Sequence, residues 1–178
     1  MGSEARDDLA RLLEDRGDYL EAVQLLREAV EIDRRIEGPD SPAYATNLHN
    51  LGGALVRVGD LFTAEINIRE SLDIERRVLG DAHPDLGYPL NLLGVVLLEE
   101  GECQKAEPVL RESLALWSKL GPNHPLFATA LANWARVLQG QLSRGTSLLR
   151  ACSCCGARLI ESPPLHGVGF GEIRVVGI

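Results

Sequence analysis

The sequence predicts an all-α protein built from stacked antiparallel helix hairpins, and three observations carry this prediction. First, the same residue types recur with a period of about 42 residues through most of the chain, which is typical of a repeat architecture. Second, apolar residues within each period step by three and four positions, which is typical of a helix with one buried face. Third, glycine and proline recur at fixed places, where each helix would have to end or begin.

The repeat is clearest at small and charged residues. The residues that share a register are Gly17, Gly59 and Gly101; Ala22, Ala64 and Ala106; Arg27, Arg69 and Arg111; and Glu28, Glu70 and Glu112. The turns between units end at Pro42, Pro84 and Pro125, so the last unit is one position shorter. Identity at this many registers indicates true structural repeats.

Each unit divides into two predicted helices. Gly17, Gly59 and Gly101 are suited to the left-handed conformation that ends a helix, and the acidic residue after each can cap the next one. We expect the first helix of successive units at about 6–16, 43–58, 85–100 and 126–138. We expect the second helix at about 19–37, 61–79 and 103–120. Pro89 stands inside the range 85–100, so that helix must begin later or bend.

The helical period also predicts which side chains are buried. The residues expected in the core are Leu51, Leu55, Leu93, Leu97, Ala64, Ala106, Leu114 and Trp134. The residues expected at the surface are Glu31, Arg34 and Arg76. Small residues such as Gly52 and Gly94 would let the two helices of a hairpin approach closely.

Charge and composition exclude several classes of function. The chain of 178 residues has a net charge of −8. Residues 139–178 carry four arginines and two glutamates, so residues 1–138 carry −10. An acidic body of this kind disfavours non-specific binding to nucleic acid or to an anionic membrane. Apolar runs are too short to span a membrane, and the start of the chain has no signal-peptide pattern, so we expect a cytoplasmic protein.

The repeat resembles a known family. The pattern Asn50-Leu51-Gly52 with Leu55, Gly59-Asp60, Ala64 and Ser71-Leu72 resembles the tetratricopeptide repeat (TPR). The length of the period and the turn Leu79-Gly80-Asp81-Ala82-His83-Pro84 are similar to the kinesin-light-chain type of that repeat. The resemblance implies a right-handed superhelical solenoid over residues 6–138. Its units would be about 6–41, 42–83, 84–124 and a partial unit 125–138.

The resemblance also implies a concave groove lined by the first helix of each unit. The polar and aromatic positions mapped to this groove are His49, Asn50, Arg57, Tyr88, Asn91, Asn133 and Arg136. Such side chains can hydrogen-bond to an extended peptide. The alternative for Asn50 and Asn133 is a structural role between neighbouring helices. A carboxylate clamp is disfavoured, because Asp7, His49 and Asn91 stand where its lysines would be.

Neither catalysis nor a cofactor is predicted. His83 and His124 belong to the turns between units, where a ring caps or packs, and no nucleophile, base and orienting group converge. Cys152, Cys154 and Cys155 include one Cys-x-x-Cys spacing but lack a second ligand pair, so we expect no metal. We therefore expect a non-enzyme without cofactor or metal.

Residues 139–178 depart from the repeat, and we expect an irregular tail that is either disordered or the product of a frameshift. Read one nucleotide ahead, cysteine codons become Ala or Val codons, and a fourth repeat can be written over this segment. The segment Glu172–Ile178 resembles a strand, but the repeats offer it no edge. Without a further helix, Leu131, Trp134 and Leu138 would form a partly exposed apolar surface prone to self-association.

Three functions compete at this point. The first is a protein-interaction scaffold that binds a peptide segment or a partner protein in the groove. The second is a structural or oligomerising fragment of a larger repeat protein without its own ligand. The third is a small metal or redox protein that uses the cysteines.

Overall fold

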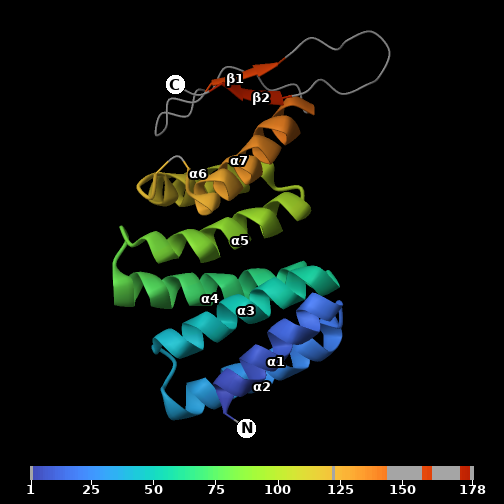
Figure 1. The fold of residues 1–178 in the computed structure, drawn as a ribbon, viewed down its shortest axis with the longest axis vertical. Coiled ribbons are helices and arrows are strands. Elements are labelled where there is room, and N and C mark those ends of the chain that lie inside the picture. The colour runs from blue at the N-terminus through green and yellow to red at the C-terminus, as the bar shows by residue number, and fades with distance from the viewer. Residues whose placement is uncertain (1, 122, 144–157, 162–172, 177–178) are drawn as a thin grey trace.

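The described residues of the chain form a stack of helix hairpins. The structure is a computed structural model that describes residues 2–121, 123–143, 158–161 and 173–176. Successive helices run antiparallel, and the hairpins follow one another along the long axis from the N-terminus upward (Figure 1). The helices are α1 (Ser3–Arg16), α2 (Tyr19–Ile36), α3 (Pro42–Val58), α4 (Leu61–Leu79), α5 (Gly87–Glu99), α6 (Cys103–Ser118) and α7 (Pro125–Ser143). The predicted all-α architecture of hairpins is confirmed.

Glycines end the first helix of the hairpins, as predicted. Gly17 and Gly59 have φ values of 87° and 85°, in the left-handed region where a side chain is disfavoured. The acidic residue that follows caps the next helix only once: the backbone N–H of Thr63 donates to Asp60 Oδ1 at 3.2 Å. Asp18 and Glu102 make no side-chain cap bond.

The turn between units starts the next helix in two different ways. Helix α3 begins at Pro42, and the N–H of Tyr44 donates to Ser41 Oγ at 3.2 Å. In the next unit a short 3-10 helix, η1 (Pro84–Leu86), comes first, and α5 begins only at Gly87. Pro89 therefore falls in the first turn of α5, where its missing N–H costs no helical hydrogen bond. Of the two outcomes expected from Pro89, a later start or a bend, the structure shows the later start.

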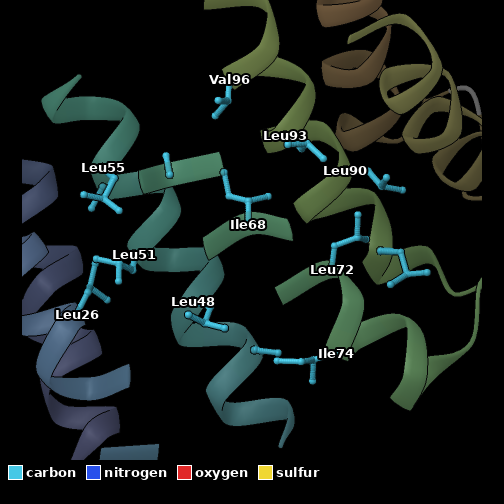
Figure 2. Close-up of a cluster of buried hydrophobic side chains, with 14 of the residues drawn as sticks. Leu26, Leu48, Leu51, Leu55, Ile68, Leu72, Ile74, Leu90, Leu93 and Val96 are labelled. Atoms are coloured by element: carbon cyan, nitrogen blue, oxygen red, sulfur yellow. The ribbon is translucent and has the colours of Figure 1, made fainter. Parts of the chain in front are cut away.

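The core runs continuously between the hairpins. Figure 2 shows leucines of α3 and α5 packed against Ile68, Leu72 and Ile74 of α4. The predicted core residues are all buried: Leu51, Leu55, Leu93, Leu97, Ala64, Ala106, Leu114 and Trp134. A Cβ at Gly52 would lie 2.5 Å from Ile68, and one at Gly94 would lie 2.3 Å from Leu110. These glycines thus permit close approach of the paired helices.

Two predictions about exposure are wrong. Arg76 is only partly exposed, because its guanidinium Nη2 donates to Glu112 Oε1 of α6 at 2.7 Å. The apolar surface expected to be partly exposed at the last hairpin is mostly buried: Trp134 is 1% exposed and Leu138 is 9% exposed, and of the three expected residues Leu131 is partly exposed. They pack with Leu114, Trp117 and Phe127 in a second cluster between α6 and α7.

The C-terminal part also differs from the expected irregular tail where it is described. Helix α7 continues to Ser143, beyond the predicted end at 138. Strands β1 (Arg158–Glu161) and β2 (Ile173–Val176) pair antiparallel, with Arg158 opposite Val176. The partner strand of β2 is thus β1 of the same C-terminal segment, not an edge offered by the repeats. Cys152, Cys154 and Cys155 lie outside the described ranges, and the frameshift hypothesis for residues 139–178 stays a prediction. In the described residues, no helix combines the length and apolar character that crossing a membrane requires.

Candidate functional site

One side of the stack is lined by α1, α3, α5 and α7, and polar side chains join these helices in pairs. Asn50 Nδ2 donates to Asp7 Oδ1 at 2.9 Å, which links α3 to α1. Asn133 Nδ2 donates to Asn91 Oδ1 at 2.8 Å, which links α7 to α5. Side-chain hydrogen bonds therefore join α1 to α3 and α5 to α7. In the described part of the chain, no such bond joins Asn50 of α3 to Asn91 of α5, and we call this place between α3 and α5 the open step.

A cleft of about 360 Å³ lies at this open step. Its polar and aromatic lining comes from four helices: Asp7, Arg11 and Glu14 of α1, His49 and Asn50 of α3, Tyr88 and Asn91 of α5, and Trp117 of α6. Gly53 also lines the cleft, and a Cβ there would meet only Leu92 Cδ2, at 3.9 Å. The missing side chain at Gly53 therefore leaves the cleft open rather than serving a close helix contact.

A second hollow of about 600 Å³ shares three residues with the cleft, His49, Asn50 and Tyr88. It is bounded by the C-terminal end of α4, through Glu75 and Leu79, and by Asp85 of η1. The shared residues place the hollow beside the cleft. Together they form one recess across α3 and α5, which we call the A-helix recess.

His49 is the most perturbed titratable group of the recess. Burial lowers the pKa of His49 from 6.5 to about 4, so the ring is neutral at physiological pH. In the described part of the chain, its buried Nδ1 atom has no hydrogen-bond partner. An unpaired buried ring nitrogen is a polar group that a ligand can satisfy.

The carboxylates of the recess lack strong cationic partners. Burial raises the pKa of Glu14, and Asp7 and Asp15 raise it further. Burial likewise raises the pKa of Glu75, and Asp85 adds to the effect. Burial is the larger cause of both pKa shifts, and the neighbouring carboxylates add to it. Arg11 and Arg57 oppose the shift of Glu14, and His83 opposes the shift of Glu75.

The structure brings only some of the predicted groove residues together. His49, Asn50, Tyr88 and Asn91 line the recess, and the Tyr88 ring stacks edge-on against Trp117 with centroids 5.3 Å apart. Asn133 contributes to the bonded step beyond it.

The two predicted arginines are occupied elsewhere. The Arg57 guanidinium carbon lies 4.7 Å above the centre of the Tyr19 ring, and its Nη2 donates to the Tyr19 hydroxyl. Arg136 Nη2 donates to Glu99 Oε1 at 2.6 Å. Neither arginine lines the cleft or the hollow.

The histidines of the turns act as caps, as predicted. The N–H of Asp85 donates to His83 Nδ1, and the N–H of Leu126 donates to His124 Nδ1, both at 3.3 Å. Within the described ranges, no group of three His, Cys, Asp or Glu side chains is placed to hold a metal ion. Cys103 is buried and free of a disulfide.

Sequence reasoning missed Glu14, Glu75 and Asp85 as residues of the recess. Glu75 stands on a helix whose charged residues recur in every unit, so it resembled an ordinary solvated face, whereas the register of Glu14 holds Val56 and Leu98 in the next two units. The signal was present for Glu75, because Asp33, Glu75 and Trp117 occupy one register in successive units. A repeat position that holds a different residue type in each unit can make different contacts in each unit.

The repeats match the profile described as tetratricopeptide repeat, over residues 4–61 and again over 48–119. Among curated proteins, none matches this chain.

Solved structures share the fold. The nearly identical TPR-like repeats of a candidate kinesin light chain from Podosopora anserina superpose with a TM-score of 0.72 at 24% identity, covering 78% of this chain and 66% of that one. BtubC (BKLC) from P. vanneervenii has a TM-score of 0.64 at 18% identity, covering 83% of this chain and 66% of that one. This chain thus spans just under two thirds of the length of either structure.

Proposed function

Because the chain belongs to the tetratricopeptide repeat family, whose repeats generally mediate protein–protein interaction, we propose that it is a non-catalytic scaffold that binds an extended protein segment in the A-helix recess. The observation that carries the proposal is the open step between α3 and α5. There, Asn50 and Asn91 line a cleft instead of bonding to each other.

The open step suits the backbone of an extended peptide. Asn50 uses Nδ2 for Asp7, so its Oδ1 is available to accept, while Asn91 uses Oδ1 for Asn133, so its Nδ2 is available to donate. A peptide unit presents one donor and one acceptor and can meet both. The half-exposed Tyr88 ring, 45% exposed, adds an apolar contact with a polar tip.

Selection of random peptides displayed on phage against the full chain, followed by fluorescence anisotropy with one synthetic selected peptide, tests the proposal. Gly53→Leu places a side chain in the cleft, and Asn91→Ala removes a donor. Each should weaken binding about tenfold or more.

Asn67→Ala is the matched control. Asn67 lies on α4, where its Nδ2 donates to the Thr63 carbonyl of its own helix, so its loss should leave affinity unchanged. Peptides that bind equally well to the wild type and to Gly53→Leu would place the binding surface elsewhere and refute the proposal.

A second candidate is self-association, favoured by Leu9 and Leu12 of α1, which are 40% and 61% exposed. The expected apolar surface at Trp134 does not support it, because that side chain is buried. Light scattering over a range of concentrations separates the candidates: a dimer abolished by Leu12→Glu would favour self-association, and a monomer would favour the scaffold.

A further inference from the structure

The carboxylate at one repeat register accepts an internal hydrogen bond in the first unit. Asp33 of α2 is 2% exposed, and it accepts a hydrogen bond from Asn47 Nδ2 of α3 at 2.6 Å. Asn47 is itself buried, at 5% exposed. This pair satisfies the buried charge from within the protein, as a buried carboxylate requires.

The corresponding pair is missing one unit later. Glu75 stands one repeat period after Asp33, but Pro89 stands one repeat period after Asn47. Proline has no side-chain donor and no N–H. Among the described residues, the Ser71 hydroxyl is the one side-chain donor to Glu75, at the long distance of 3.3 Å. The half-buried carboxylate of Glu75 thus keeps most of its capacity to accept hydrogen bonds.

Glu75 lines the 600 Å³ hollow together with a second carboxylate, Asp85. His83 Nδ1 lies 3.7 Å from Asp85 Oδ2 and accepts the backbone N–H of Asp85, so His83 lies beside the hollow without lining it. Among the described residues that line the hollow, none is a lysine or an arginine. Its two carboxylates therefore face space without a fixed cation from these walls.

The remaining walls suit a long side chain with a charged end. Ile74, Val78 and Leu79 of α4 supply aliphatic surface, and Tyr88 supplies an aromatic ring. Lysine and arginine bury their methylene stems along such surfaces while the charged end seeks acidic groups. A cation above a tyrosine ring gains further attraction.

We propose that this hollow binds a lysine or arginine side chain of the protein segment that occupies the A-helix recess. The inference rests on the proposed function, and it specifies the chemistry of the partner: a segment with a basic residue, not an acidic one. The neighbouring cleft agrees in charge. Its ionisable lining includes Asp7 and Glu14, and its one arginine, Arg11, already pairs with Asp8 through Nη2 and Oδ1 at 2.5 Å.

A protein segment fits better than a free polyamine because the hollow adjoins the cleft. His49, Asn50 and Tyr88 line both spaces, so a chain that bonds to Asn50 and Asn91 can direct a side chain towards Glu75. A polyamine would use the carboxylates and leave the asparagines of the cleft unused.

The peptides selected by phage display provide the test. We expect lysine or arginine to be enriched at one peptide position. Replacing that residue by glutamine in the synthetic peptide should weaken binding to the wild type about tenfold. The substitution Glu75→Gln should weaken the basic peptide by the same factor and leave the glutamine peptide unaffected.

Asp73→Asn is the matched control, because it removes the same charge from an exposed position on the same helix, outside the hollow. It should change affinity less than about twofold. Thermal melting of each variant verifies that it is folded, and competition with spermine measures what a free polyamine achieves.

The outcomes separate this inference from the function on which it rests. Peptides that are sensitive to Gly53→Leu but show no basic preference, or that ignore Glu75→Gln, would overturn the inference and leave the scaffold proposal standing. Failure to select any peptide that depends on the recess would overturn both. Spermine binding at least as tight as the basic peptide, or a Glu75-dependent dimer in light scattering, would overturn the choice of a partner segment as occupant.

Discussion

The junction between α2 and α3 and the junction between α4 and α5 are built on the same repeat, yet only the first is closed by a buried polar pair. At the first, Asn47 donates to Asp33 in the interior. At the second, Pro89 replaces the donor, α5 begins late behind η1, and Glu75 faces a hollow. The comparison teaches that a solenoid can leave a carboxylate facing a hollow by omitting one internal partner, without adding any new element.

The apolar contacts of the two junctions should contribute equally to stability. Truncating one core leucine at each junction gives the largest effect that we expect. Leu51 and Leu93 share a register and are 4% and 1% exposed. Each substitution to alanine should cost about 2–5 kcal/mol of unfolding free energy, as truncations in a packed core do. Urea denaturation measures both. A loss below about 0.5 kcal/mol at one position alone would show that the junctions differ in their core as well.

The loss of stability on changing a polar-pair position should differ between the two junctions. Asn47→Ala leaves the Asp33 carboxylate buried without its donor and should cost about 3 kcal/mol. Pro89→Ala, at the same register of the open junction, should change stability by less than about 1 kcal/mol, because no buried charge depends on it. Equal losses in urea denaturation would break the comparison.

Acidification should weaken the molecule through His49, which lines the open junction. The folded-state pKa, about 4, lies below the unfolded value of 6.5. Above pH 6.5 both states are neutral and stability is unaffected. As the pH falls from 6.5 towards 4, the unfolded chain gains the proton first, so up to about 3 kcal/mol is lost. Urea denaturation at pH 6.5 and at pH 4 measures the loss of unfolding free energy in the wild type and in His49→Gln. The variant should lose about 3 kcal/mol less than the wild type over this range. An equal loss in both proteins would show that the His49 ring is accessible to protons in the folded state.

The smallest effect concerns Glu75 itself. Pro89→Asn should supply the donor seen at the first junction and move the pKa of Glu75 down towards its ordinary value. Carboxyl carbon chemical shifts in an NMR pH titration report this pKa directly. An unchanged pKa would mean that burial and Asp85, rather than the missing donor, account for the raised value.

Much of the fold was predictable from local patterns. Glycines at Gly17 and Gly59, prolines at Pro42 and Pro125, and the three-four apolar steps depend on short-range backbone geometry, so the hairpins and their core followed from them. The delayed start of α5 was foreseen from Pro89 for the same reason. Exposure at the last hairpin was predicted wrongly, since the volume that Trp117 and Trp134 fill between α6 and α7 depends on how two helices pack.

The candidate site, like the fold, was predictable in part from the sequence. By itself the sequence determined the register of the groove positions, and hence that Asn50, Tyr88 and Asn91 would lie on one side, because equal spacing in a repeat gives equal placement. Only the tertiary structure decided which of them bond to a neighbour and which face a cleft. It directed Arg57 to Tyr19 and Arg136 to Glu99, and left Glu75 beside a hollow. The physical reason is that a long polar side chain can reach several partners that lie a few ångströms apart. Which partner it contacts depends on the distances between helices, and helix packing sets these distances.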